Sequence, residues 1–375
     1  MNSSPDVLIM GGGAIGLATA IELASHGAQV TLLSRNFQEA ALHAAAGMLA
    51  PQAEGLAPGS MLDLCLQSRA LYPDWTAQLT AFTGLETGYW PCGILAPCYG
   101  NSVPTETRVE EREWCDRTTL LQHQPDLSPE VVGGWWFPQD AQVNPQQLAQ
   151  VLWQAAQQLG ITLAEGVCVN ALECRDNQIQ QVQTNVGTWQ AQTYVLATGA
   201  WSQQLLPIPV TPRKGQLLSV QTTAQPLRQI LFGSDVYIVP RQAGRIVVGA
   251  TSEDVGFAAY NTPDGIHALL TAAMRLYPPL ADFPLEDCWW GFRPATPDEE
   301  PILGQSPYKN LILATGHYRN GILLAPITAR LLTALILSGQ ADPCLADFSW
   351  QRFTPQFPIT PHPSQVVLSS MITRF

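Results

Sequence analysis

Three glycines near the start of the chain have the spacing of a phosphate-binding turn. Gly11, Gly13 and Gly16 form a G-x-G-x-x-G pattern that follows a short apolar run and opens a helical pattern. The first glycine permits a tight turn, the second lets the backbone approach a pyrophosphate, and the third lets helix and strand pack closely. Unpaired N–H groups at the helix N-terminus then face the phosphates. The pattern predicts a dinucleotide-binding site.

The segments around these glycines complete a β-α-β unit. Residues 7–10 predict a strand, the stretch up to about His26 predicts a helix, and residues 28–33 predict a second strand. Such a unit usually ends with an acidic residue that binds the ribose hydroxyls, but here Ser34 stands there, followed by Arg35. Because a hydroxyl is a weaker acceptor than a carboxylate, this departure bears on affinity and not on the kind of site.

Two later segments, residues 193–198 and 311–315, repeat the pattern of a strand followed by glycine, and we expect both to join the first sheet. Between them, residues 210–220, 237–240 and 246–251 are rich in β-formers and predict a separate antiparallel sheet. We therefore predict an α/β fold, in which a Rossmann-like dinucleotide-binding domain carries an inserted α+β substrate domain built on an antiparallel sheet.

The predicted domains are discontinuous in the sequence. We assign to the dinucleotide-binding domain residues 1–85, 145–210 and 286–353. We assign to the substrate domain residues 86–144 and 211–285. Residues 128–145 predict a loop-and-strand connection. The tail, residues 354–375, carries four prolines before Ser364, and we expect an extended or disordered strip, or an arm against a neighbour.

Composition excludes several classes of function. The chain has 375 residues and a formal net charge of −12, which repels phosphate backbones, so nucleic acid is not an expected partner. The apolar stretch over residues 7–33 contains three consecutive glycines and charged residues, so it predicts neither a membrane span nor a signal peptide. Eight dispersed cysteines without a C-x-x-C pair indicate small core residues in a reducing compartment, and we expect the cytoplasm.

Several segments resemble the D-amino-acid oxidase superfamily and, within it, the glycine oxidases of thiamine biosynthesis. The resemblance runs from about residue 6 to residue 335. The segments that carry it are residues 44–49 (AAAGML), 237–241 (YIVPR), 291–294 (GFRP) and 316–326 (GHYRNGILLAP). The last of these is the most specific. Ser34, His43, Phe232 and the proline-bearing tail depart from the family's pattern.

The resemblance implies that the dinucleotide is FAD. It places Ala14 and Ile15 by the pyrophosphate, Ser34 and Arg35 by the adenosine ribose, and Val169 on the adenine side. It also places cofactor contacts at Ala41, Leu42, Ala46, Gly47, Met48, His317, Tyr318, Arg319, Asn320, Gly321, Ile322 and Leu323. We further expect a helix to start near Gly321. The N–H donors at its N-terminus would stabilise the negative charge of a reduced flavin.

The resemblance also implies the substrate contacts. A guanidinium suits an amino-acid carboxylate because two parallel N–H bonds fix its position and tilt, and the family places that arginine at Arg293. Tyr237 would add a phenolic hydroxyl, and Arg319 would help to enclose the substrate. We predict no catalytic general base, because the lone pair of a neutral amine can expel the α-hydrogen as hydride to flavin N5.

The predicted reaction is the oxidation of glycine, sarcosine or small D-amino acids to the imino acid, which water converts to the oxo acid and ammonia. The resemblance implies O2 as the acceptor, with hydrogen peroxide as product. We expect non-covalent FAD, since the cysteine nearest to Arg293 is Cys288. A homo-oligomer, either a dimer or a tetramer, is expected, as is a link to thiazole synthase through dehydroglycine.

Other functions stay open as alternatives. A sibling oxidase or dehydrogenase would act on sarcosine, D-proline or a larger D-amino acid, and an acidic residue in the pocket would point to a cationic substrate. A flavin-binding protein without turnover belongs to another class, and Ser34 is the feature in its favour. A nicotinamide dehydrogenase is a third alternative, which the colour of the purified protein would distinguish.

Overall fold

The computed structural model describes residues 5–100, 108–109, 111–353 and 364–368. Its central sheet has six strands, in the order β19, β20, β13, β1, β2 and β9, and only β19 runs antiparallel to its neighbour. The bounds are β1 Val7–Met10, β2 Val30–Ser34, β9 Thr162–Glu165, β13 Thr193–Leu196, β19 Ile302–Gln305 and β20 Leu311–Thr315. The prediction that the segments around residues 193 and 311 join the first sheet is therefore confirmed.

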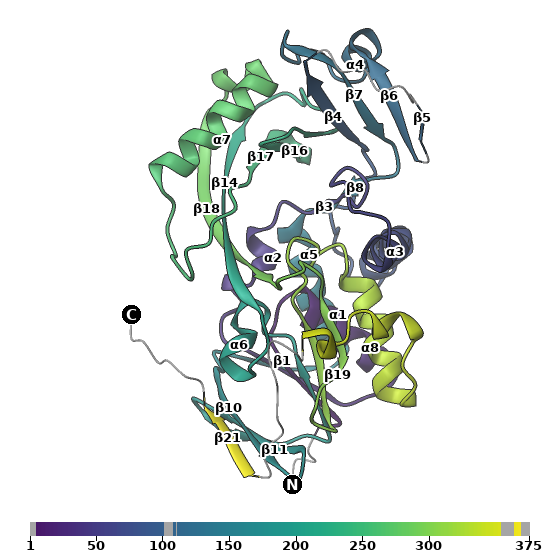
Figure 1. Cartoon of the computed structure of the whole chain (residues 1–375), viewed down its shortest axis with the longest axis vertical. Coiled ribbons are helices and arrows are strands. Elements are labelled where there is room, and N and C mark those ends of the chain that lie inside the picture. The colour runs from purple at the N-terminus through teal and green to yellow at the C-terminus, as the bar shows by residue number, and fades with distance from the viewer. Residues whose placement is uncertain (1–4, 101–107, 110, 354–363, 369–375) are drawn as a thin grey trace.

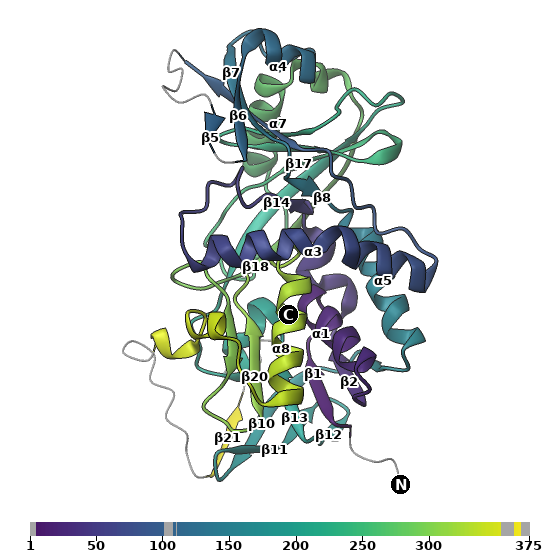
Figure 2. The ribbon, with the colours of Figure 1, turned by 90° about the vertical axis from the view of Figure 1, so that its right-hand side faces the viewer.

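Alternating side chains of β1 enter two different apolar layers. Val7 and Ile9 pack into a core shared with helices, whereas Leu8 and Met10 pack into a second core on the other face. The covering helices are α1 Ala14–Ser25, α3 Ser60–Thr83, α5 Pro145–Gln158 and α8 Ala325–Ser338. Figure 2 shows α1 and α8 lying over the strands, with α3 crossing above them.

A four-stranded antiparallel sheet covers the other face, in the order β12, β11, β10 and β21. Its strands are β10 Val169–Arg175, β11 Gln178–Thr184, β12 Gly187–Trp189 and β21 Ser364–Leu368. Strand β21 comes from the tail and pairs antiparallel with β10 (Figure 1). This segment is extended, as expected, but its partner is this chain and not a neighbour. The rest of the tail lies outside the described residues.

The second domain is built on a nine-stranded sheet that lies above the first domain in Figure 1. Its strands, in spatial order, are β18 Leu285–Ala295, β14 Thr211–Gln221, β17 Arg245–Gly249, β16 Tyr237–Pro240, β15 Ile230–Phe232, β4 Ile94–Tyr99, β7 Val131–Phe137, β6 Arg112–Asp116 and β5 Arg108–Val109. The pairs β14–β17, β16–β17 and β14–β18 are antiparallel, which confirms the predicted inserted sheet. Only β15 and β4 pair in parallel.

One face of this sheet packs on helix α7 (Pro263–Leu276), and the other faces the first domain. Leu218 and Val248 pack with Leu269 of α7, whereas Leu217 and Val247 pack with Ala46 from the first domain. Because side chains alternate along β14 and β17, one face of the sheet forms a core with α7 and the opposite face is turned toward the first domain. The remaining α-helices and strands are α2 Ala41–Ala44, β3 Met48–Leu49, α4 Arg117–His123, β8 Ala141–Gln142 and α6 Ser202–Leu205.

One domain boundary differs from the sequence-based one. Strand β18 continues through residue 295 in the nine-stranded sheet, so the boundary placed at residue 286 falls inside this strand. The loop-and-strand connection predicted over residues 128–145 does contain a strand, β7, which has seven residues and lies between β4 and β6. Gly133 and Gly134 lie within it because an added Cβ would come within 2.6 Å of Trp114 and 2.7 Å of the Ala96 carbonyl.

Candidate functional site

A cavity of about 420 Å³ runs from the end of β2 to the face of the nine-stranded sheet. Most of the predicted site residues line it, although they come from segments far apart in the sequence. They are Gly11, Gly13, Ala14, Ile15, Ser34, Arg35, Ala41, Leu42, Ala46, Gly47, Met48, Val169, Tyr237, Arg293, His317, Tyr318, Arg319, Gly321 and Ile322. Gly16, Asn320 and Leu323 are not in the wall.

The N-terminus of α1 opens into this cavity. Gly13 is its N-terminal flanking residue, no side chain caps the helix, and its first turn holds no acidic residue. A Cβ added at Gly13 would have only Ala40 at 4.0 Å as a neighbour, so the backbone is open to a ligand there. Gly16 instead lies inside α1, where an added Cβ would come within 1.9 Å of the Gly11 carbonyl oxygen. Uncapped N–H groups and a positive dipole end fit a pyrophosphate.

Ser34, Arg35 and Val169 lie at one end of the cavity. The Arg35 guanidinium stacks 4.4 Å from the ring centroid of Trp201 and forms an ion pair of 2.6 Å with Glu39. Both Trp201 and Glu39 also line the cavity, and the sequence analysis named neither. Glu39 brings a carboxylate to the end where Ser34 replaces the usual acidic residue. The prediction that this end receives an adenosine stays a prediction, now with two further candidate contacts.

Residues 44–49 are fixed from both sides. Gly47 has a φ of +72°, and a Cβ there would lie 2.1 Å from the Val143 carbonyl oxygen, so only glycine fits without strain. The buried Arg241 donates hydrogen bonds to the Ala46 carbonyl and to the side chain of Gln142. The motif over residues 237–241 therefore holds the segment against the nine-stranded sheet.

The segment from Gly316 is a turn and not yet a helix. Gly316 and Tyr318 both have positive φ, and Tyr318 donates its N–H to the Pro294 carbonyl at 2.9 Å. Residues 321–324 form a turn, and α8 begins only at Ala325. The predicted helix start near Gly321 is thus wrong by about one turn. Pro326 accounts for the difference, because proline favours the first turn of a helix.

His317 lies at the buried side of this turn. Its Nε2 lies 3.2 Å from the Thr328 hydroxyl of α8, and burial lowers the pKa of the imidazole to about 3. The ring is therefore neutral at physiological pH and anchors the turn to the helix. This geometry gives His317 a structural role.

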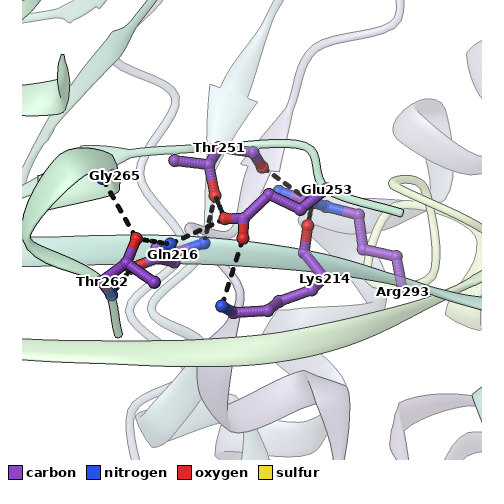
Figure 3. Close-up of polar contacts among 7 residues, drawn as sticks. All are labelled: Lys214, Gln216, Thr251, Glu253, Thr262, Gly265 and Arg293. Atoms are coloured by element: carbon purple, nitrogen blue, oxygen red, sulfur yellow. Dashed lines mark hydrogen bonds and ion pairs between the residues drawn. The ribbon is translucent and has the colours of Figure 1, made fainter. Parts of the chain in front are cut away.

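Arg293 lies at the other end of the cavity, on β18. Its Nη1 donates to the Thr251 carbonyl at 3.1 Å and to the Lys214 carbonyl at 3.4 Å (Figure 3). The guanidinium lies over Gly215 of β14, where an added Cβ would come within 2.4 Å of Nη1. Both hydrogen bonds use one nitrogen, so a bound carboxylate would take the other N–H groups.

Behind Arg293, Glu253 holds together the two segments that supply these carbonyls. Its carboxylate accepts hydrogen bonds from Thr251 Oγ1, from Gln216 Nε2 at 2.8 Å and from the buried Lys214 Nζ at 3.2 Å (Figure 3). Burial opposes its ionisation, but these three hydrogen bonds together lower the pKa of Glu253. The network thus fixes the backbone around Lys214 and Thr251, and with it the orientation of Arg293.

Tyr237 completes this end of the cavity. A Cβ at Gly249 would lie 2.6 Å from the Tyr237 hydroxyl, so the ring occupies the space that this glycine leaves. Burial raises the pKa of Tyr237, although the adjacent Arg293 lowers it in part. At neutral pH the phenol keeps its proton and can donate it to a carboxylate oxygen.

Glu54 is a residue of this end that the sequence analysis did not name. It follows residues 44–49 by a few positions and lines the cavity together with Arg293 and Arg319. Its Oε2 lies 3.6 Å from Arg319 Nη2. The proximity to residues 44–49 in the sequence was a usable signal, but nothing local indicated that this carboxylate points inward. Within the described residues, no cluster of three or more His, Cys, Asp or Glu side chains could hold a metal ion.

Comparison with known proteins agrees with this geometry. A family model described as FAD dependent oxidoreductase matches residues 6–335. Glycine oxidase of Geobacillus kaustophilus is 33% identical, over 92% of this chain and 97% of the relative. The crystal structure of glycine oxidase from the same organism superimposes with a TM-score of 0.86 at 31% identity, covering 93% of this chain and 99% of that chain.

The bifunctional protein ThiO/ThiG of Trichormus variabilis is more similar still, at 55% identity over 95% of this chain. It is also longer, and this chain covers 56% of it, so the chain spans about half the length of such relatives. No helix in the described part of the chain is long and apolar enough to cross a membrane. The match over residues 6–335 and the resemblance of both fold and sequence show that this chain belongs to the family of FAD-dependent oxidoreductases that includes the glycine oxidases.

Proposed function

We propose that this chain oxidises glycine and other small amines, such as sarcosine and small D-amino acids, at the α-carbon. The observation that carries the proposal is that one cavity is lined at one end by an uncapped helix N-terminus and at the other by the half-buried pair of Arg293 and Tyr237. The first end suits the pyrophosphate of FAD, and the second suits a small carboxylate.

The residues of the chain bind and align the substrate. Arg293 would hold the carboxylate through two N–H bonds, and the protonated Tyr237 would donate a third hydrogen bond to it. Arg319 would enclose the substrate from the turn after β20. When bound, FAD supplies the hydride acceptor, with O2 as the proposed final acceptor that becomes hydrogen peroxide. Loss of hydride from the α-carbon of the neutral amine leaves an imino acid, which water hydrolyses to the oxo acid and ammonia.

FAD is expected to bind without a covalent link. Cys288 is the cysteine nearest to Arg293 in the sequence, but it is not part of the cavity wall. Its side chain belongs to the layer between the nine-stranded sheet and α7, on the face away from the first domain. This placement supports the non-covalent attachment predicted above.

The relatives support a link to thiamine biosynthesis. The protein of Trichormus variabilis carries a region like this chain within a longer polypeptide named bifunctional. A physical link between two activities suits the handover of a hydrolysable imine, and we propose that dehydroglycine passes from this site to a thiazole synthase in the cytoplasm. Deletion of the gene should then create a thiazole requirement under aerobic growth, and normal growth without thiazole would contradict the link. A homo-oligomer, either dimer or tetramer, remains our expectation.

The reaction is tested by anaerobic mixing of the purified FAD-bound protein with glycine, sarcosine and D-alanine in turn. Oxidised flavin absorbs near roughly 450 nm, and a substrate bleaches this band. We expect rapid bleaching by glycine and recovery in air, with release of hydrogen peroxide. A yellow protein that none of the three amines bleaches would contradict the proposal and favour a larger amine or a protein without turnover.

The carboxylate anchor is tested by Arg293→Ala. Loss of the guanidinium should cost roughly 2 to 5 kcal/mol of substrate binding and transition-state alignment, because the substrate carboxylate would lose its charged partner. Steady-state kinetics with glycine measure kcat/KM, and flavin absorbance measures FAD content, which should not change. Arg275→Ala is the control, because Arg275 is exposed on α7 and pairs with Glu130. Unchanged kcat/KM in Arg293→Ala would show that the anchor lies elsewhere.

A further inference from the structure

The side chain of Glu54 is buried in the wall of the cavity without a hydrogen bond. It is only 9% exposed, and within the described residues its Oε2 has no hydrogen-bond partner. The nearest cation, Arg319, lies at 3.6 Å, which is beyond hydrogen-bond distance. A buried carboxylate left in this state is costly, and burial raises the pKa of Glu54. Such a group calls for a hydrogen-bond donor that the described residues do not supply.

Hydrogen bonds from neighbouring segments hold the loop that carries Glu54. The N–H of Ala53 donates to Asp140 Oδ2 at 2.9 Å, and Arg69 donates to Asp140 Oδ1 at 2.7 Å and to Gln52 Oε1 at 2.5 Å. The N–H of Glu54 itself donates to the Ala50 carbonyl at 3.0 Å. These hydrogen bonds, of which one is buried and two are partly buried, hold the backbone around Glu54 in place.

Glu54 shares its part of the cavity with the proposed carboxylate anchor. After burial, the charges of Arg319 and Arg293 are the strongest influences on Glu54, and both lower its pKa. In turn, Glu54 raises the pKa of Tyr237. Glu54, Arg293 and Tyr237 also line the same cavity, so one carboxyl group shares this end with the guanidinium and the phenol. An amino acid carries a carboxylate and an amino group about two bonds apart, which is the pattern of charges that this arrangement complements.

Pairing with Arg319 alone does not account for Glu54. The Arg319 side chain is 43% exposed, and a long ion pair with an exposed partner contributes little to stability. It also leaves Oε2 without a hydrogen bond, which is the feature that needs an explanation.

We infer that the Glu54 carboxylate accepts a hydrogen bond from the amino group of the substrate while Arg293 binds the substrate's carboxylate. The inference rests on the proposed function and deepens it, because it makes Glu54 the residue that distinguishes a small amino acid from a carboxylate of the same size without nitrogen.

The test compares Glu54→Gln with the wild type toward two ligands of equal size. Glycine carries the amino group, and in propionate a methyl group replaces it. The apparent Kd of glycine comes from the concentration dependence of anaerobic flavin bleaching, and that of propionate from calorimetry on the oxidised FAD-bound protein. We expect Glu54→Gln to raise the apparent Kd of glycine by roughly 10- to 100-fold, which corresponds to the loss of one charge-assisted hydrogen bond. The Kd of propionate should change by less than about threefold.

The matched control is Glu299→Gln, which removes the same charge from an exposed residue near Glu54 but outside the cavity wall. It should leave both ligands unaffected. Equal losses for glycine and propionate in Glu54→Gln would assign Glu54 a structural role, and no loss for either would also overturn the inference. Thermal unfolding adds a separate readout, because removing an unpaired buried charge should leave the melting temperature equal or higher, whereas losing a structural ion pair should lower it.

Failure of the proposed function is distinguishable from failure of this inference. If glycine does not bleach the wild-type flavin, the proposed function fails. In that case calorimetry with glycine replaces the bleaching measurement, and the ratio of glycine to propionate affinity in the two variants still decides the role of Glu54.

Discussion

Two glycines of the nine-stranded sheet provide the space for the two proposed substrate-binding side chains. Gly215 lies under the Arg293 guanidinium, and Gly249 lies under the Tyr237 ring. An added methyl group would come within 2.4 Å of the first side chain and 2.6 Å of the second. The geometry of the proposed substrate end therefore depends on the lack of side chains at these two positions of β14 and β17 as much as on Arg293 and Tyr237 themselves.

Gly215→Ala should displace Arg293 without removing it. We expect kcat/KM for glycine to fall by roughly 10- to 100-fold, because small misplacements of a substrate-positioning group cost about this much. FAD content should match the wild type, since Gly215 lies in β14 of the nine-stranded sheet and is not among the residues predicted to contact FAD. Steady-state kinetics and flavin absorbance provide the two measurements, and a variant with full activity would show that Arg293 has room to move.

The neutral state of His317 should make stability depend on pH. Burial lowers the pKa of His317 to about 3, whereas an unfolded histidine titrates near its ordinary value of 6.5. Between these two values the unfolded chain binds a proton on this histidine and the folded chain does not. The contribution of neutral His317 to the free energy of unfolding is therefore fully present above pH 6.5 and is lost as the pH falls toward 3. In His317→Gln the free energy of unfolding should fall less steeply with acidification, by up to about 1.4 kcal/mol per pH unit.

Urea unfolding at several pH values between about 4.5 and 7.5 measures this slope. His26→Gln is the control, because His26 is exposed at the end of α1 and bonds to the Glu22 carbonyl. Equal slopes for His317→Gln and the wild type would mean that folding does not shift the pKa of His317, which would contradict its burial as a neutral ring.

At this scale, the sequence predicted the residues that lie within motifs and missed those that act from outside them. Arg293 and Tyr237 were found because the flanking residues resemble a known family, and both line the cavity. Glu54, Glu39 and Trp201 were missed, since the direction in which a loop side chain points depends on distant contacts. For Glu54 those contacts come from Asp140 and Arg69.

Among the elements, α3 supports the turn that precedes α8. The Ser68 hydroxyl donates to the Leu323 carbonyl, and the buried Tyr72 hydroxyl donates to the Ile322 carbonyl, both at 2.5 Å. These two bonds cross from one helix of the covering layer to the turn that is proposed to contact the flavin. The position of the turn is therefore set by α3 and not only by its own sequence.

Tyr72→Phe should loosen this turn while leaving the packed ring in place. It leaves the buried Ile322 carbonyl without its donor, so we expect a loss of roughly 1 to 3 kcal/mol in the free energy of unfolding and weaker binding of FAD. Urea unfolding and titration of the apoprotein with FAD measure the two effects. Thr83→Val, at the end of the same helix, is the control, because the Thr83 hydroxyl bonds only to the Leu79 carbonyl of α3 and to the N–H of Leu85 just after the helix. If FAD affinity were unchanged in Tyr72→Phe, the support from α3 would not reach the cofactor site.

Element boundaries show where the sequence patterns were sufficient. The first β-α-β unit was predicted to within a few residues, because its apolar runs and glycines are local signals. Strand β7 was read as part of a connection because of its glycines, which admit the Trp114 ring and the backbone of β4 from neighbouring strands. The tail strand β21 could not be assigned a partner, since its pairing with β10 joins residues nearly two hundred positions apart.

At the scale of the whole molecule, the cavity is bounded by two domains whose segments alternate along the chain. FAD bound there would contact both, so it should stabilise the folded state as a unit. We expect the melting temperature of the apoprotein to rise with FAD, corresponding to about 2.7 kcal/mol at a hundredfold excess over Kd. FMN, which lacks the adenosine, should stabilise less because it leaves the end near Arg35 empty. Equal stabilisation by FMN and FAD would contradict the placement of the adenosine.

The order of strands in the central sheet also affects how the protein is made. Strand β1 can pair at once with β2, but its other neighbour, β13, begins at residue 193, and β20 ends at residue 315. At a synthesis rate of roughly 5 to 20 residues per second, β20 leaves the ribosome about 15 to 60 s after β1. Throughout this interval, the nascent chain carries an unpaired and strongly apolar strand edge, which makes the unfinished protein more prone to aggregation than the finished one.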